Sequence, residues 1–128
     1  MSRVFDCLVM TPEKIIYDGE AEFAVLQAHD GELGFLPDHM TLIGELGIGE
    51  MRIMKHHQVE RIVIEGGIVE FSNNRVTVLT EIALQKQDLN IAELQEKLEI
   101  LEADETCSKT FRNIERQRLK ARIKLAMK

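Results

Sequence analysis

The spacing of apolar residues changes once along this chain, after Ala83, and the change limits the folds that the chain can adopt. Before it, apolar and polar residues alternate over short runs such as residues 5–9, which is the period of a half-buried β-strand. Turn signals separate these runs at intervals of ~8–12 residues, without intervening helices, which favours an antiparallel β-sandwich or barrel over a parallel sheet. The expected turns include Asp18-Gly19, His56-His57 and Asn73-Asn74. We therefore expect residues 1–84 to form an antiparallel β-sandwich.

Residues 85–128 follow a helical period instead. Alternating steps of three and four residues separate Ile91, Leu94, Leu98 and Leu101. This spacing predicts an amphipathic helix over about residues 89–104, with Asn90 in a capping arrangement. The pattern breaks at residues 104–108, and Thr106 or Ser108 can cap a second helix over about 108–127. A linker this short predicts an antiparallel helical hairpin.

The two expected helices carry opposite charge. Residues 88–105 hold seven acidic residues against Lys97, whereas residues 108–128 hold eight basic residues against Glu115. The basic residues of interest are Arg112, Arg116, Arg118, Lys120, Arg122 and Lys124. Two interpretations stay open: solvated faces that attract each other by ~0–1 kcal/mol per exposed pair, or a detachable arm whose basic side seeks an acidic partner. The net charge of −6 argues against nucleic acid as the main partner.

The segment from Gly31 to Leu42 is expected to form a shaped loop, because its glycines and Pro37 constrain the backbone. Its Asp38-His39 pair has no third group to complete a catalytic site. The chain has no nucleophile elbow, zinc-binding helix, phosphate-binding glycine loop or Cys-x-x-Cys pair. We therefore expect no catalytic residue, no metal site and no cofactor, and structural or solvated roles for all four histidines.

No run approaches the ~20 apolar residues of a membrane span, and the N-terminus enters a strand-like pattern at once, without a targeting peptide. Cys7 and Cys107 lie far apart in a cysteine-poor chain, which suits a reducing compartment. Any association with a membrane is therefore expected to be peripheral.

Three segments, in this order, resemble the epsilon subunit of F-type ATP synthase: residues 31–39, residues 48–53, and the run from Glu65 to Glu70 that continues into residues 76–79. The resemblance covers nearly the whole chain. It implies a non-catalytic subunit of the central stalk that binds the gamma subunit, rests on the c-ring and turns with both, coupling proton translocation to ATP synthesis. By resemblance, the contact loop for the c-ring and gamma comprises Gly31, Glu32, Leu33, Gly34, Pro37 and His39.

The resemblance also favours the detachable arm. In bacterial relatives the C-terminal helices rise along gamma, place basic side chains against the beta and alpha subunits, and inhibit ATP hydrolysis. Some relatives bind ATP through an Ile/Leu-Asp-x-x-Arg-Ala motif that opens the first helix. Here Asn90 lacks the carboxylate of that motif, and Glu93 stands where its arginine should meet phosphate. We expect no nucleotide binding by that mode.

Two other interpretations remain: a free-standing adaptor made of a β-sandwich and a helical hairpin, and a small enzyme that uses Asp38-His39. The missing targeting peptide favours the cytoplasmic face of a bacterial plasma membrane, with the stromal face of the thylakoid as the alternative.

Overall fold

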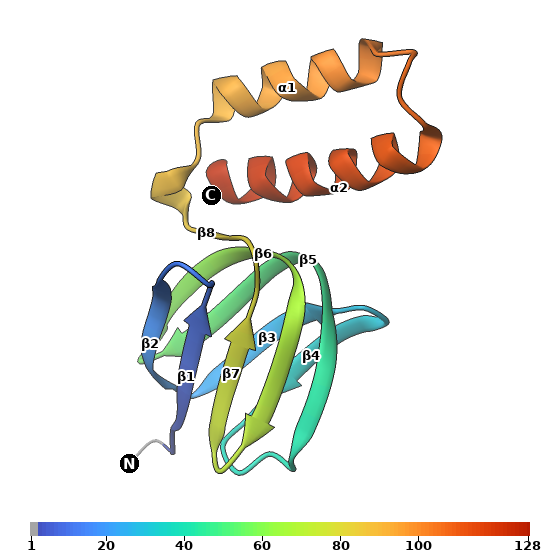
Figure 1. Ribbon diagram of the computed structural model, residues 1–128. Coiled ribbons are helices and arrows are strands. Elements are labelled where there is room, and N and C mark those ends of the chain that lie inside the picture. The colour runs from blue at the N-terminus through green and yellow to red at the C-terminus, as the bar shows by residue number, and fades with distance from the viewer. Residues whose placement is uncertain (1–2) are drawn as a thin grey trace.

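The computed structural model describes residues 3–128 as a β-sandwich with a helical hairpin over one of its ends (Figure 1). The strands are β1 (Phe5–Met10), β2 (Ile15–Ala21), β3 (Phe23–Ala28), β4 (Gly31–Phe35), β5 (Leu42–Lys55), β6 (Gln58–Ser72), β7 (Arg75–Leu79) and β8 (Ala83–Leu84). The helices are the 3-10 turn η1 (Lys86–Asp88), α1 (Ile91–Ala103) and α2 (Lys109–Ala126). The expected class, a β-sandwich followed by two helices, is confirmed.

The strands form one sheet in the order β2-β1-β7-β6-β5-β3-β4, and the short β8 pairs with β6. The sheet folds over on itself around the long strands β5 and β6 (Figure 1). Its pairs are antiparallel, as expected, except that β1 runs parallel to β7. The parallel pair arises because the first strand of the chain lies beside a strand that is distant in sequence, without a hairpin between them.

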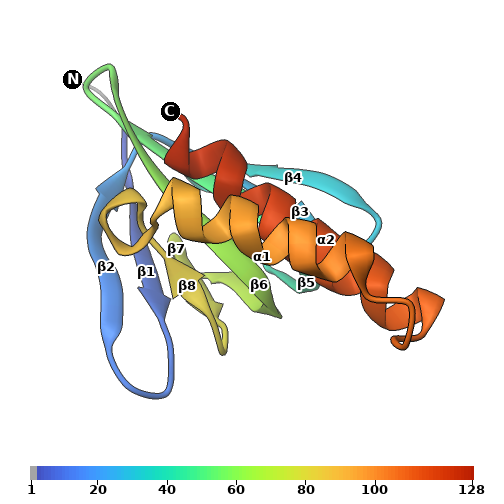
Figure 2. The same cartoon turned by 90° about the horizontal axis from the view of Figure 1, so that it is seen from above.

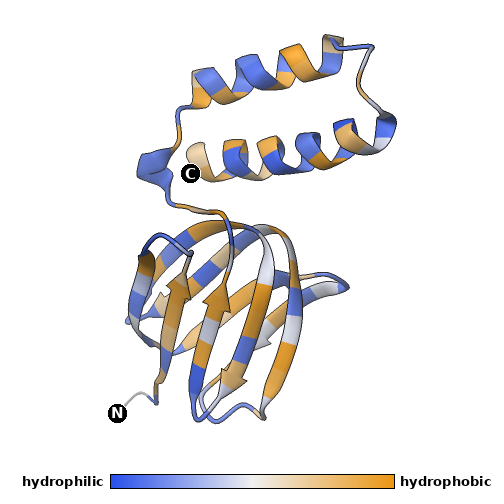
Figure 3. Ribbon diagram, in the orientation of Figure 1, coloured by the Kyte–Doolittle hydropathy of each residue, from blue (hydrophilic) through white to orange (hydrophobic). Residues whose placement is uncertain are grey.

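Aromatic side chains fill the core between the two layers. The ring of Phe71 lies 5.4 Å from that of Phe35, in a stacked arrangement, and 5.7 Å from that of Phe5, edge to face. All three are at most 1% exposed. Colouring by hydropathy shows the alternation along the strands that puts such residues inside (Figure 3).

Two of the expected turns are confirmed. His56, His57, Asn73 and Asn74 all have positive φ, between 51° and 65°, as tight hairpin turns require. The prediction of a turn at Asp18-Gly19 is wrong, because both residues lie inside β2 and pair with Leu8 and Cys7. The chain turns earlier, at Thr11–Lys14, where Pro12 has a suitable fixed φ and the N–H of Thr11 donates to the carbonyl of Lys14 over 2.9 Å.

The loop expected from Gly31 to Leu42 is shorter than the sequence suggested. Residues 31–35 pair with β3 as strand β4, and Leu42 opens β5, so that only residues 36–41 form the connection. A strand with two glycines was hard to predict, since glycine is disfavoured in strands and β4 pairs on one side only.

The helices begin at side-chain caps. Asn90 Oδ1 accepts the N–H of Glu93 at 3.2 Å, and Ser108 Oγ accepts the N–H of Phe111 at 3.1 Å. Of the two candidate caps for α2, Ser108 is therefore the one that caps the helix, while Thr106 donates to Asp104.

The helix α2 lies between α1 and the sandwich, and the view from above shows α1 running along it over the strands (Figures 1 and 2). Leu119 and Leu125 of α2 and Leu94 of α1 are the buried residues of the hairpin. Contacts between α2 and strands β5 and β6 join the hairpin to the sandwich. We call α1 and α2 together the arm, and its position against the sandwich the docked position.

Candidate functional site

One buried carboxylate connects the arm to the sandwich. Glu65, in the middle of β6, has a side chain that is only 3% exposed. Its Oε1 accepts hydrogen bonds from Arg118 Nε at 2.6 Å and from Arg122 Nη2 at 3.0 Å, and its Oε2 accepts one from Arg122 Nε at 2.5 Å. These bonds to Glu65 raise the pKa of Arg118 above its ordinary value. Arg118 also donates to Glu115, one helical turn earlier, over 2.6 Å.

A second carboxylate holds the C-terminal end of α2. Both oxygens of Glu50, on β5, accept from Lys128 Nζ, at 3.0 and 3.1 Å. The same carboxylate accepts from Arg61 Nη1 at 2.7 Å. The last turn of α2 is therefore fixed by charge as well as by the burial of Leu125, which is 1% exposed.

Within the arm, basic side chains of α2 join it to α1. Arg116 forms a bidentate pair with Glu102, at 2.5 and 2.9 Å, and these bonds lower the pKa of that carboxyl. Arg112 donates to the backbone carbonyl of Asp104, at the end of α1. Hydrogen bonds from Thr106 lower the pKa of Asp104.

Lys120 and Lys124 complete the set of six basic residues singled out in the sequence, and both are exposed. Among residues 3–128, no carboxylate lies within ion-pairing distance of either ammonium group. The docked arm thus pairs Arg116, Arg118 and Arg122 with carboxylates, holds Arg112 by a backbone carbonyl, and presents two lysines to solvent.

The connection between β4 and β5 lies at the end of the sandwich opposite the arm, because Asp38 N–H donates to Asn74 Oδ1 over 2.8 Å, in the β6–β7 turn (Figure 1). Leu36 and Met40 are 57% and 75% exposed there. His39 lies inward of them, with its ring 5.0 Å from that of Phe35. We call residues 36–41 the foot turn.

Asp38 and His39 point to different partners. The Asp38 carboxylate forms an ion pair with Arg3, whereas His39 Nδ1 lies 2.7 Å from the carbonyl of Met40. The pair is therefore not arranged as an acid and a base acting on one substrate.

The six residues expected in one contact loop are divided by β4. Pro37 and His39 belong to the foot turn, while Gly31 and Glu32 lie near the β3–β4 tip at the other end of the strand. Glu32 Oε2 accepts from Gln27 Nε2 at 3.0 Å. Leu33 and Gly34 lie between these ends, so that the six residues follow one sheet edge rather than one loop. 

An apolar row crosses the outer face of the sheet. Ladder pairing places Ile15 beside Met10, Met10 beside Leu79, and Leu79 beside Ile68, on the four neighbouring strands β2, β1, β7 and β6. Ile15, Leu79 and Ile68 are 58%, 45% and 51% exposed. A shallow, largely apolar hollow with Pro12 at its rim lies over part of the row. A contiguous exposed apolar patch of this kind is typical of a protein-binding surface.

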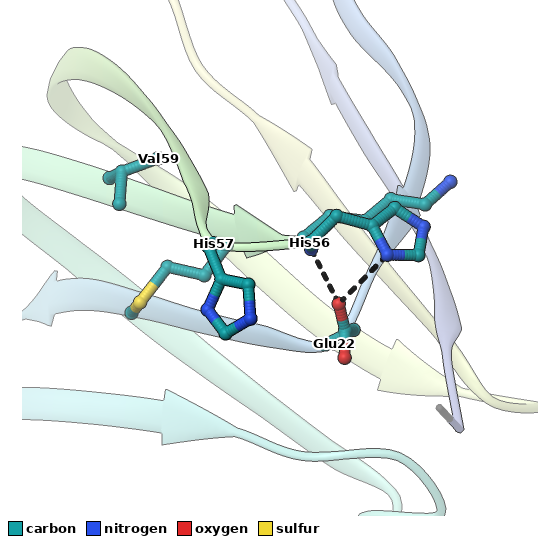
Figure 4. Close-up of a pocket in the computed structure, with 6 residues that line it drawn as sticks. Glu22, His56, His57 and Val59 are labelled. Atoms are coloured by element: carbon teal, nitrogen blue, oxygen red, sulfur yellow. Dashed lines mark hydrogen bonds and ion pairs between the residues drawn. The ribbon is translucent and has the colours of Figure 1, made fainter. Parts of the chain in front are cut away.

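The paired histidines form another hollow, at the β5–β6 tip (Figure 4). The backbone N–H of His56 donates to Glu22 Oε1 over 2.6 Å, and the His56 ring nitrogen Nδ1 lies 3.8 Å from the same oxygen. The rest of the lining is His57, Met54, Lys55 and Val59, with no serine, threonine or cysteine as a nucleophile. Glu22 thus supports the strained turn, whose two histidines both have positive φ.

The acidic and histidine side chains do not gather into a metal site in the described part of the chain, because no three His, Cys, Asp or Glu side chains of residues 3–128 lie so that they could hold a metal ion. At the start of α1, where the resemblance would place a nucleotide motif, Asn90 caps the helix and Glu93 pairs with Lys97 at 3.3 Å. No helix in the described part of the chain is long and apolar enough to span a membrane.

Glu65 is not among the candidate site residues expected from the sequence. The available signal was a charged residue placed directly after the apolar run of residues 62–64. Its arginine partners lie 53 and 57 residues further along the chain, beyond the reach of local patterns.

Known proteins that are similar to this chain belong to one family. The family model of the β-sandwich domain of the ATP synthase delta/epsilon chain matches residues 4–86. The chain is 36% identical over 118 residues to the ATP synthase epsilon chain of Leptospira borgpetersenii serovar Hardjo-bovis, which covers 92% of this chain and 91% of that one. It is 38% identical over 96 residues to the chloroplastic ATP synthase epsilon chain of Solanum lycopersicum, covering 75% and 72% of the two chains.

The fold is also similar to that of a chain in the cryo-EM structure of the Euglena gracilis mitochondrial ATP synthase, OSCP/F1/c-ring, in rotational state 1. The TM-score is 0.83 at 16% sequence identity, over 100% of this chain and 83% of that chain. At this identity the similarity concerns the fold alone, and it extends over the arm as well as the sandwich.

Proposed function

This chain belongs to the ATP synthase delta/epsilon chain family, as an epsilon chain, and we propose that it is a non-catalytic rotor subunit of the central stalk. In this role it turns with the gamma subunit and the c-ring, so that proton flow through the membrane is coupled to ATP synthesis on the beta subunits. The observation that carries the proposal is a sandwich with separate exposed surfaces: an apolar row on one face, a foot turn at one end and a charged arm at the other.

The apolar row is the surface that we assign to gamma. Ile15, Met10, Leu79 and Ile68 lie side by side on four strands of one sheet, so the surface is held rigidly by the ladder. A rotor contact has to transmit torque, and rigid strands suit that task better than a flexible loop does.

The c-ring contact is assigned to the foot turn and the adjoining edge strand β4, from Leu36 and Met40 to Glu32. Leu36 and Met40 offer exposed apolar side chains, and the Glu32 side chain is 56% exposed. The packing of His39 against Phe35 supports the turn from inside. A c-ring contact would place the chain at the membrane surface as a peripheral subunit, on the cytoplasmic face in a bacterium or the stromal face in a chloroplast.

The arm is assigned a regulatory role, the inhibition of ATP hydrolysis. In the extended position α2 would lie along gamma and present its basic side chains to acidic segments of the beta and alpha subunits. The exposed Lys120 and Lys124 are available for a first contact even from the docked position. Nucleotide is given no part in this switch, since Asn90 and Glu93 depart from the nucleotide motif and are engaged within the chain.

The partner assignment is tested by co-purification with gamma. Ile68→Asp puts a charge in the centre of the apolar row and should abolish stoichiometric recovery with gamma, because burying an unpaired carboxylate is costly. Val59→Asp is the matched control, since Val59 is 42% exposed and lies outside the row. Full recovery of the Ile68→Asp chain would contradict the assignment, and a wild-type chain that never follows gamma would favour a free-standing adaptor.

The regulatory role is tested by truncation. Removal of residues from Asp88 onward should raise the ATP hydrolysis rate of the assembled complex while the complex stays intact. An unchanged rate in a complex that retains the truncated chain would refute inhibition by the arm.

A further inference from the structure

Among residues 3–128, Glu65 is the one carboxylate of the sandwich that binds two arginines of α2. Both of its oxygens are engaged, and the second positive charge at the site is offset by Glu115, which pairs with Arg118. Each of the two guanidinium groups therefore makes two hydrogen bonds to carboxylate oxygens while the arm is docked.

The burial of this cluster depends on the arm itself. The Glu65 side chain is 3% exposed, and the Arg118 and Arg122 side chains are 29% and 19% exposed, at a contact made by α2 upon β6. When α2 leaves, the carboxylate and both guanidinium groups regain water. The desolvation cost of a buried ion pair is then recovered, so that the cluster can open at moderate cost.

Arg118 and Arg122 are one helical turn apart and share the face of α2 that meets the sandwich. An acidic segment of another subunit has to compete with Glu65 for these two side chains while the arm is docked. Lys120 and Lys124, in contrast, are exposed in the docked position. The two groups of cations thus differ in when they become available.

From this geometry we propose that Glu65 is an internal counterion that competes with an acidic partner segment for Arg118 and Arg122, and so sets how readily the arm leaves the sandwich. The proposal rests on the proposed inhibitory function and adds its regulating residue. A partner's carboxylates would first meet the two exposed lysines and then replace Glu65 at the arginines. Loss of the Glu65 charge should favour the extended arm and strengthen inhibition.

The first experiment measures the position of the arm in the full chain. Spin labels on cysteines introduced at the exposed residues Gln58, at the start of β6, and Gln117, on α2, report the distance between sandwich and arm. Cys107 is replaced by serine, while Cys7 can stay, because burial raises the pKa of its thiol to about 12 and keeps it unreactive. Glu65→Gln should raise the ratio of extended to docked arm about tenfold, since charge-assisted hydrogen bonds become neutral ones.

The matched control is Glu99→Gln, which removes the same charge from an exposed residue of α1 that has no ion pair within residues 3–128. It should leave the distance distribution unchanged. A Glu65→Gln distribution identical to that of the wild type, or an equal shift in the control, would overturn the counterion role. Arg118→Gln with Arg122→Gln tests the same contact from α2, should Glu65→Gln fail to fold, and it should release the arm to a similar extent.

The second experiment measures ATP hydrolysis by the assembled complex. Glu65→Gln should lower the rate at least about twofold, because it frees the arginines, whereas the double arginine variant should raise the rate, because it removes them. A released arm with an unchanged rate in both variants would leave Glu65 as the counterion and refute the inhibitory function instead. The two readouts therefore separate a failure of this inference from a failure of the proposed function.

Discussion

Gly67 is the residue at which a single methyl group should do most damage to the sandwich. Its φ is +118°, and a Cβ placed on it would lie 2.2 Å from the carbonyl oxygen of Leu79 and 2.9 Å from Cα of Thr80. Both are backbone atoms, one in the last residue of β7 and the other in the residue that follows it, and Ile68, next to Gly67, pairs with Leu79. The substitution Gly67→Ala therefore has to push β6 and β7 apart.

The neighbouring glycine supplies a control for backbone strain alone. Gly66 also has positive φ, +79°, but a Cβ there would meet nothing within 4 Å. Gly66→Ala should thus cost only the unfavourable φ, about 1–3 kcal/mol. Gly67→Ala should cost about 2 kcal/mol more, because it adds the loss of a strand hydrogen bond and of close packing.

Urea unfolding of the full chain measures this difference. Tyr17 is the only tyrosine and the chain has no tryptophan, so its fluorescence reports on the sandwich. With a slope of about 1–3 kcal/mol per molar urea, the midpoints of the two variants should differ by about 1 M. Equal midpoints would refute the reasoning, since they would mean that the strands separate at that point without cost.

Two further predictions concern the arm. Leu125→Ala should remove about 2–4 kcal/mol of docking energy, because the side chain is 1% exposed, and should speed amide hydrogen exchange in α2. The control is Met127→Ala, at a residue that is 69% exposed. Equal exchange rates in the two variants would contradict the prediction. Acid should loosen the contact between α1 and α2. Arg116 holds the pKa of Glu102 below its ordinary value of 4.5. The stabilisation of the α1–α2 contact by this ion pair is therefore complete above pH 4.5 and is lost as the pH falls through the lowered pKa. NMR titration of the helix amides would show this, and a Glu102→Gln chain with the same acid response would contradict it.

Much of the fold could be predicted because its signals are local. The change of period after Ala83 separates strands from helices, and the dipeptides at the tips of β5–β6 and β6–β7 adopt the positive φ that hairpins need. The resemblance to the epsilon subunit of ATP synthase, carried by three short segments, is confirmed by the family match over residues 4–86.

The errors and omissions all depend on contacts with another element of the fold. Asp18-Gly19 has turn chemistry, but the registry of β2 against β1 extends it as a strand. Gly31 and Gly34 suggest a loop, but β3 lies close enough to pair with them. Glu65 is an ordinary charged residue in the sequence, and it gains its two arginine partners only when α2 returns across the sandwich. Local sequence patterns cannot predict such contacts between elements.

The parallel pairing of β1 with β7 has a consequence for how the chain is made. On the ribosome, β1 and β2 emerge before the other strands of the sandwich, yet one side of β1 stays unpaired until Arg75–Leu79 have been synthesised. Pairing between segments so far apart is slow, and the open strand edge is prone to aggregate in the meantime. The arm is translated after β7, so the sandwich can close before α2 exists, and Glu65 is in place before the arginines that it binds.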